Sequence, residues 1–130
     1  VYLNYAEALI EAGTNLDLAA SAINTVRSRS NMPNISTGSQ SELRDKMRHE
    51  KRIELAFEEH RFWDIRRWGI AGDPETLTIY KVNMNRQGRL VGDGRAIWET
   101  RNWNAQAGKL FPIPQSEIDK NSNLTQNPGY

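Results

Sequence analysis

The stretch from Glu42 to Trp68, ELRDKMRHEKRIELAFEEHRFWDIRRW, decides the fold of this chain. As one α-helix it would be about 40 Å long, at roughly 1.5 Å per residue. At about 100° per residue, one stripe of that helix mixes apolar and charged side chains. The stripe consists of Leu43, Met47, Glu50, Glu54, Phe57, Arg61, Ile65 and Trp68. After Arg52, apolar residues occur on most sides, as is typical of a helix surrounded by other elements. The sequence therefore predicts a long central helix over 42–68 with neighbours on at least two faces.

Charged residues recur along this central helix at helical spacing, and they have two interpretations. They are Glu50, Glu54, Glu58, Arg61 and Asp64. In the first, they form a partly buried ion network that holds the helix to its neighbours, so that the loss of one partner costs about 3–5 kcal/mol. In the second, Glu50, Glu54 and Asp64 are the carboxylates of an enzyme that performs acid–base catalysis. We favour the ion network because no nucleophile or set of metal ligands accompanies the carboxylates.

The composition excludes several classes of protein. The 130 residues suit one domain, and 17 basic against 16 acidic residues produce no field that would attract nucleic acid or an anionic membrane. The absence of cysteine excludes disulfides, thiolate zinc sites and cysteine nucleophiles. No apolar run approaches the ~20 residues that a membrane-spanning helix needs. We therefore expect one domain that binds no nucleic acid.

Residues 1–30 are predicted to form two short helices packed as an αα-hairpin. Gly13 supplies the left-handed residue that ends a helix, and Asn15 is a residue type that caps the next one. Small alanine side chains would let the two helices approach closely, and the size of the pair resembles one tetratricopeptide-type unit. The first helix begins at Tyr2, directly after Val1 and without a capping residue. We therefore expect the chain to be the C-terminal piece of a longer protein.

Turn and cap signals bound the central helix and the segment that follows it. Ser39 and Glu42 have the spacing of a capping box, which starts the helix, and Gly69 or Gly72 is expected to end it. Residues 77–103 contain short β-type runs separated by Gln-Gly and Gly-Asp-Gly turn signals. This segment therefore predicts a small, irregular β-hairpin region.

Residues 110–130 predict an extended C-terminal tail. Pro112 and Pro114 favour extended backbone, and a short helix is expected over 115–119. The polar remainder needs to dock onto the helices to be ordered. The predicted fold is therefore mainly α: a tetratricopeptide-like αα-hairpin and a long central helix, followed by the irregular β-hairpin region and the docked tail, in one C-terminal domain over 1–130.

The two histidines complete no metal-binding pattern. His49-Glu50 begins like the zinc motif H-E-x-x-H, but Ile53 stands where the second histidine belongs, and His60 has no ligand partner at the required spacing. Neither a glycine-rich phosphate loop nor a serine nucleophile motif is present. We therefore expect no metal site and no cofactor.

Two tryptophans in the irregular region are the candidates for ligand binding. Trp98 and Trp103, the second with Asn102 beside it, could form a sugar platform, in which an exposed indole stacks on the ligand and amides bind hydroxyls. The alternative is that these rings pin the β-type region onto the helices, and we favour it. Trp63 and Trp68, on the central helix, are interpreted as packing residues.

Three stretches of the chain resemble the SusD/RagB family. HEKRIELAFEEHRFWDIRRWG (49–69) looks like the signature helix of that family, and LFPIPQSEIDKNSNLTQNPGY (110–130) is similar to its C-terminus. The opening YLNYAEALIEAG…AINTVRSRSNMP (2–33) resembles the family's last tetratricopeptide-like hairpin. The three motifs occur in the family's order and cover nearly the whole chain.

The resemblance implies a function but names no binding residue. Members of the family are mainly helical surface lipoproteins of the Gram-negative outer membrane and are not enzymes. They sit as a lid over a SusC-like TonB-dependent transporter and deliver oligosaccharides or peptides to it. The motifs matched here are scaffold motifs, so no sugar-contacting position of the family can be carried over. The resemblance further implies that membrane attachment depends on an N-terminal lipid anchor absent from this chain.

A second interpretation stays open at this point. A tetratricopeptide-like hairpin can also serve as a protein–protein interaction scaffold that binds no small ligand. Quenching of Trp98 or Trp103 fluorescence by soluble oligosaccharides would favour glycan binding over this alternative.

Overall fold

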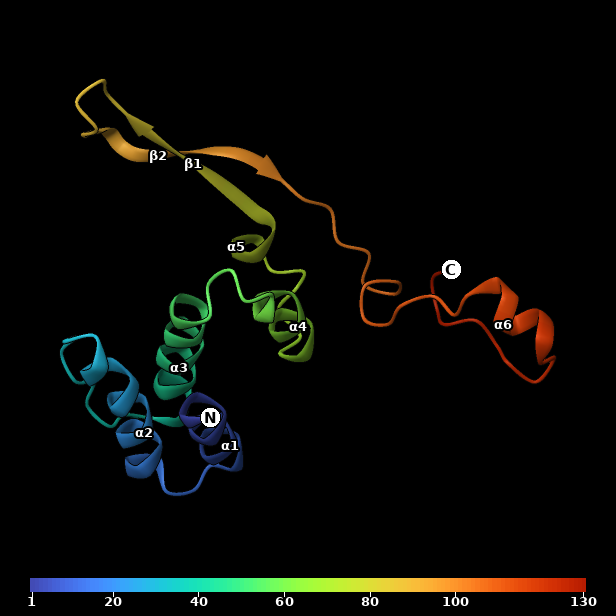
Figure 1. Ribbon diagram of the computed structural model, residues 1–130, viewed down its shortest axis with the longest axis horizontal. Coiled ribbons are helices and arrows are strands. Elements are labelled where there is room, and N and C mark those ends of the chain that lie inside the picture. Colours follow the sequence, from blue (N-terminus) through green and yellow to red (C-terminus); the bar gives the residue numbers. More distant parts are fainter. The chain divides into compact units, whose positions relative to one another are not determined.

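The computed structural model describes all of residues 1–130 and is mainly helical, as the sequence predicts. It contains six helices and one two-stranded antiparallel sheet (Figure 1). The chain divides into two compact units, Val1–Arg61 and Phe62–Tyr130. The elements are α1 (Tyr2–Ala12), α2 (Leu16–Arg29), α3 (Gln40–Glu54), α4 (His60–Arg67), α5 (Pro74–Leu77), β1 (Thr78–Met84), β2 (Leu90–Thr100) and α6 (Gln115–Lys120).

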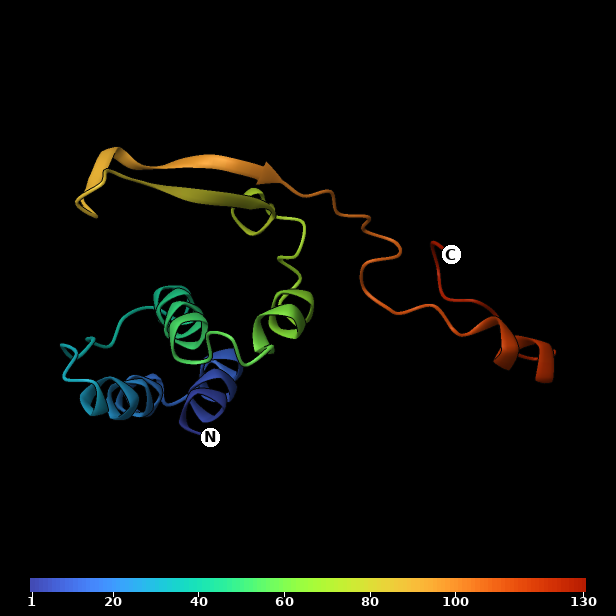
Figure 2. The same cartoon turned by 45° about the horizontal axis from the view of Figure 1, so that its top comes forward.

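The predicted αα-hairpin is formed by α1 and α2, with α3 packed against both (Figures 1 and 2). Gly13 ends α1 in the left-handed conformation, with φ +68°, and its N–H donates to the carbonyl of Ile10. Asn15 stands at the cap position of α2 but is itself left-handed, and its side chain makes no capping hydrogen bond. The expected Asn15 side-chain cap is therefore wrong, although the helix begins where the sequence predicts.

Small and branched apolar side chains fill the space between the three helices. The alanines let α1 and α2 approach closely, because a methyl side chain needs little room. Ile10, Ile23, Leu43 and Met47 are the largest side chains that are fully buried. The buried apolar residues of this unit are Leu3, Ala6, Ile10, Ala19, Ala20, Ala22, Ile23, Leu43 and Met47.

The capping box at the start of α3 is confirmed. The backbone N–H of Glu42 donates to the Ser39 hydroxyl at 3.2 Å, and the Ser39 N–H donates to the Glu42 carboxylate at 2.8 Å. Hydrogen bonds from the Ser39 backbone and hydroxyl lower the pKa of the Glu42 carboxyl. The next residue, Gln40, donates from its side chain to the carbonyl of Ile10 at 2.5 Å. The start of α3 thus also satisfies a carbonyl group at the end of α1.

The single central helix over 42–68 is wrong, because the segment forms two helices. α3 ends at Glu54, and α4 covers only His60–Arg67. Between them Phe57 (φ +66°) and Glu59 (φ +64°) are left-handed, which interrupts the helical hydrogen-bond ladder. Phe57, expected on the buried stripe, is fully exposed at 104% of its reference area. The apolar residues that occur on most sides after Arg52 therefore belong to a break and a second helix, not to one enclosed rod.

The predicted β-hairpin region is a two-stranded ribbon, drawn side by side in both views (Figures 1 and 2). Gly88 lies in its turn with φ +73°, and the Asn85 side chain accepts hydrogen bonds from the N–H groups of Gln87 and Arg89. The Gly-Asp-Gly signal at 92–94 does not form a second turn, since it lies inside β2. Its glycines have positive φ next to a register irregularity, as is usual for a β-bulge.

The C-terminal tail, residues 110–130, is held by hydrogen bonds within it and by one to the segment directly before it. The Gln126 side chain accepts from the N–H of Ile113 at 2.8 Å and donates to its carbonyl at 2.9 Å, in the manner of a neighbouring strand. The Tyr130 hydroxyl donates to the carbonyl of Ala107 at 2.8 Å. The short helix expected over 115–119 is α6, which begins directly after Pro114. These bonds order a polar segment that has no buried core of its own.

Candidate functional site

Two ion pairs join α2 to α3. Arg27 donates to the Glu50 carboxylate at 2.5 Å, and both side chains are largely buried. One helical turn further along α3, Glu54 pairs with Arg29 nearer the surface. The two acids of the predicted network that lie on α3 therefore face arginines of a neighbouring helix.

A second row of ion pairs joins α1 to the opposite edge of α3. The Lys51 ammonium and the Glu7 carboxylate are 3.1 Å apart, and their side chains are only 4% and 8% exposed. Arg44 donates two hydrogen bonds of 2.8 Å to Glu11, and this guanidinium holds the pKa of the Glu11 carboxyl below its usual range. α3 thus presents a basic edge to α1 and an acidic edge to α2.

The other three members of the predicted network follow α3 in the sequence. Glu58 is exposed in the break between the helices, and Arg61 is half-buried at the start of α4. Asp64 is buried and accepts a hydrogen bond from Arg67, three residues later, at 2.8 Å. Glu50 and Glu54 are thus paired with arginines of α2, and one network that also includes Glu58, Arg61 and Asp64 stays a prediction.

Sequence reasoning missed the partners of these acids, although a signal for them exists. Glu7 and Glu11 are four residues apart on α1, and Arg44 and Lys51 are seven apart on α3. Each pair therefore occupies one helix face. A row of acids on α1 and a row of basic residues on α3 predict contact between these helices only if it is already known that the two helices are neighbours. Since each of these carboxylates faces a cation, the arrangement favours a structural role over acid–base catalysis.

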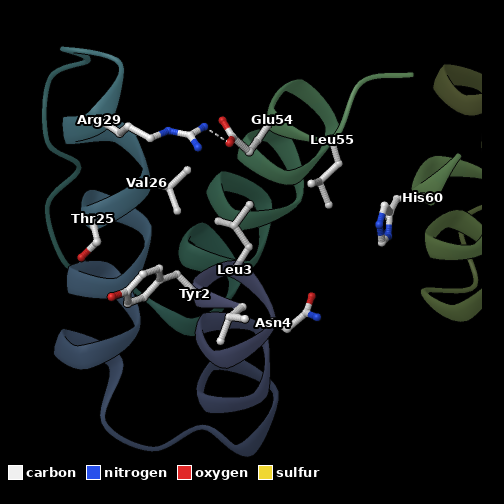
Figure 3. Close-up of a pocket in the computed structure, with 10 residues that line it drawn as sticks. Tyr2, Leu3, Asn4, Thr25, Val26, Arg29, Glu54, Leu55 and His60 are labelled. Atoms are coloured by element: carbon white, nitrogen blue, oxygen red, sulfur yellow. Dashed lines mark hydrogen bonds and ion pairs between the residues drawn. The ribbon is translucent and has the colours of Figure 1, made fainter. Parts of the chain in front are cut away.

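A cavity of about 390 Å³ lies within the first unit, between the start of α1 and the ends of α2 and α3 (Figure 3). Leu3 and Val26 form part of its apolar wall, and Arg29 reaches across to Glu54 at its edge. His60 also lines it and is exposed. No sequence pattern indicated this cavity, because its walls come from α1, α2, α3 and the first residue of α4, which are separated in the sequence.

The two candidate tryptophans have different surroundings. Trp98 on β2 is 68% exposed, and the Lys81 ammonium lies 5.4 Å from the centre of its ring. Trp103 is half-buried, and its ring packs closely against two glycines. A Cβ atom at Gly108 would lie only 2.4 Å from the ring, and one at Gly72 only 2.9 Å away, so a larger residue at either position would clash with it. Asn102 is exposed. Trp103 is therefore placed as a packing residue, whereas Trp98 offers an open aromatic surface.

An aromatic cluster links α4 to the start of the tail. Phe62 stacks on Phe111 with ring centres 6.1 Å apart, and Trp63 meets Phe111 edge-on at 5.7 Å. The Arg66 guanidinium lies 3.5 Å over the Phe62 ring and donates to the carbonyl of Gly108 at 3.1 Å. Trp63 packs here, as expected, but remains 57% exposed. The tail is therefore docked onto α4 through aromatic and cation–π contacts.

Comparison with known proteins gives a consistent match. All of residues 1–130 match the sequence model of the SusD family. The chain is 34% identical over 139 aligned residues to SusD-like protein P2 of Formosa agariphila, of which it covers 24%. It resembles the crystal structure of a SusD-like protein from Bacteroides fragilis with a TM-score of 0.80 and 39% identity. It resembles the selenomethionine form of BT4246 with a TM-score of 0.77 and 28% identity.

These alignments cover almost all of this chain and a minor part of each relative. The two solved structures are matched over 99% of this chain, but over only 24% and 23% of their own lengths. The chain thus spans about a quarter of the length of the relatives that it matches. Members of the SusD family bind ligands and are not catalysts. None of the helices described here has both the length and the apolar character needed to span a membrane.

Proposed function

Because the chain belongs to the SusD family, we propose that this protein binds oligosaccharides at the outer surface of a Gram-negative cell and delivers them to a SusC-like TonB-dependent transporter. The observation that carries this proposal is the match of all of residues 1–130 to the family, together with relatives at 34% and 39% identity. Attachment to the outer membrane would depend on a lipid anchor, as in surface lipoproteins.

Within this function, we assign the helical unit a structural role. Its acids face basic side chains of neighbouring helices, which stabilises one arrangement of α1, α2 and α3. The exposed ring of Trp98 is the candidate contact for a sugar, with Asn102 near it in the sequence. A sugar ring presents C–H groups that can stack on an indole face, and the amide can bind hydroxyls.

Saccharide titrations of the protein test this proposal. Isothermal calorimetry and tryptophan fluorescence should show binding of at least one oligosaccharide class, and Trp98→Ala should weaken it about tenfold, the order of a lost aromatic contact. Phe57→Ala removes an even more exposed aromatic side chain from the other unit and should leave the affinity unchanged. Flat titrations with neutral and acidic oligosaccharides alike would contradict glycan binding.

Copurification with the transporter separates the two interpretations of the family scaffold. We expect the protein to copurify with a SusC-like transporter and to increase uptake of the bound oligosaccharide. Copurification that persists while every saccharide titration stays flat would favour a protein–protein scaffold instead.

A further inference from the structure

We propose that the ribbon formed by β1 and β2 selects acidic oligosaccharides, those that carry carboxylate or sulfate groups. The inference rests on the proposed glycan-binding function and names the class of ligand that the Trp98 site would take. It is carried by the local charge of the ribbon, by the position of Trp98 in a β-bulge on an exposed strand, and by the lysine over its ring.

The charge of the ribbon differs from that of the rest of the chain. Between Thr78 and Thr100, four side chains are basic and two are acidic, whereas the whole chain has a formal net charge of only +1. The ribbon therefore carries +2, and the remaining residues are net negative. The basic residues of the ribbon are Lys81, Arg86, Arg89 and Arg95. Charge concentrated on an exposed, narrow element attracts anionic ligands more strongly than the average over the chain suggests.

Trp98 is the extra residue of a β-bulge. Tyr80 pairs with Ile97, and the preceding residue, Ile79, pairs with Glu99, so Trp98 has no partner across the ribbon. A bulge re-aims the side chain of its extra residue and locally ends regular pairing. Trp98 is 68% exposed, and the regularly paired Ile97 next to it is 64% exposed. The open faces of the two-stranded ribbon therefore account for the exposure, and the bulge sets the direction of the Trp98 side chain.

A cation lies over the exposed ring. The Lys81 ammonium is 5.4 Å from the centre of the Trp98 ring, over one of its faces, and Glu99 is 3.9 Å from Arg101. For a sugar stacked on the other face, the long and flexible lysine side chain can reach a substituent that extends past the edge of the indole. A carboxylate or sulfate there would form an ion pair with Lys81, whereas an uncharged hydroxyl could only accept a weaker hydrogen bond from it. A neutral sugar therefore gains the stacking contact and no ion pair.

Other occupants of the ribbon fit less well. A second copy of this chain would bring two ribbons of the same sign together, which is unfavourable. Single-stranded nucleic acid would also be attracted by cations and could stack on Trp98. The balanced charge of the whole chain argues against nucleic acid, because long polyanions are held by many cations over an extended surface.

The test compares matched pairs of acidic and neutral saccharides by calorimetry. The first pair is tetragalacturonate and its methyl ester, and the second is sulfated and unsulfated dextran oligosaccharides of equal length. We expect at least one acidic member to bind about threefold to fivefold more tightly than its neutral partner, the range of an exposed charge pair. This preference should shrink as ionic strength rises from about 0.01 M to 0.15 M. The pair with the larger preference for its acidic member shows whether the ribbon favours carboxylate or sulfate.

Substitutions locate the preference on the ribbon. Lys81→Gln should abolish most of the preference and keep the neutral affinity, whereas Trp98→Ala should weaken both ligands. Arg52→Gln removes an equal charge from an exposed position on α3 and should change neither affinity. Circular dichroism of each variant checks that the fold is retained.

The possible failures are distinguishable. Equal binding of acidic and neutral saccharides would overturn the inference and leave the proposed function standing. Absence of binding to every saccharide would overturn both. Tighter binding of oligothymidylate than of either acidic saccharide, or an acidic preference unaffected by Lys81→Gln, would also overturn the inference.

Discussion

At the scale of single residues, the backbone at Glu59 is the clearest source of strain. Its φ of +64° is a left-handed conformation that costs an L-residue about 1–2 kcal/mol and that glycine adopts readily. The side chain is exposed, so its removal loses no packing. We therefore expect Glu59→Gly to raise the free energy of unfolding by roughly 0.5–1 kcal/mol, measured by urea denaturation.

The neighbouring residue provides the control. Glu58 is exposed in the same break but does not have positive φ, so Glu58→Gly should lower the free energy of unfolding by roughly 0.5–1 kcal/mol. Equal effects of the two substitutions would show that the left-handed conformation at Glu59 is not a source of strain.

The Glu11–Arg44 pair makes stability depend on pH at the acidic end. Because Arg44 lowers the pKa of Glu11 in the folded state, the unfolded chain binds the proton more readily. The stabilisation is therefore fully present above the usual glutamate pKa of about 4.3 and is lost as the pH falls through the lowered value. Melting curves should show that Glu11→Gln flattens this part of the pH profile. Arg44→Gln should do the same, and the double variant should add little.

At the scale of elements, the contact between α1 and α3 depends on the buried pair Glu7 and Lys51. Lys51→Met would leave the Glu7 carboxylate buried without this cation, which costs about 3–5 kcal/mol. The free energy of unfolding of the double variant Glu7→Leu/Lys51→Met should be closer to that of the parent protein, because two apolar side chains replace the two buried charges. Chemical denaturation measures both, and a double variant no better than the single would contradict the argument.

The attachment of the tail depends on Gln126. Its side chain makes two hydrogen bonds to the backbone of Ile113, and Gln126→Ala removes both. We expect faster hydrogen exchange at the Ile113 amide and faster proteolysis of the last residues, with little change in the melting of the helical unit. Gln115→Ala removes an exposed side chain that bonds only Asp119 and should have neither effect.

Local sequence signals predicted where most helices and strands begin and end. The features that they did not predict depend on contacts between residues distant in the sequence. Gly13 and the Ser39–Glu42 capping box act within one helical turn, so the sequence reveals them. The break between α3 and α4 contains neither glycine nor proline. The helical spacing of apolar residues continues through it in the sequence, although the backbone is left-handed at Phe57 and Glu59. Such a break depends on tertiary contacts that no local pattern records.

The two candidate tryptophans illustrate the same limit. Trp98 and Trp103 both follow β-type runs and look alike in sequence. Their surroundings differ because Gly72 and Gly108, distant from each other along the chain, leave room for the ring of Trp103, whereas Trp98 lies on the open two-stranded ribbon. The sequence indicates both residues as candidates, and their part in ligand binding stays a prediction.

At the scale of the whole molecule, the chain combines a helical unit ordered by charge pairs with a second unit that carries the ribbon and the tail. Because the chain spans about a quarter of its relatives, the proposed transport function belongs to the protein as a whole. The part assigned here to the ligand is one ring and one cation on the ribbon.

The opposite edges of α3 have a consequence for the topology of the helical unit. An arrangement with α1 and α2 exchanged would bury the same apolar residues almost equally well, since alanine and isoleucine occur in both helices. It would, however, bring Arg27 next to Arg44 and Lys51, and Glu7 next to Glu50. Repulsion between like charges thus penalises the mirror-image topology, and the ion pairs select the handedness that apolar packing alone leaves ambiguous.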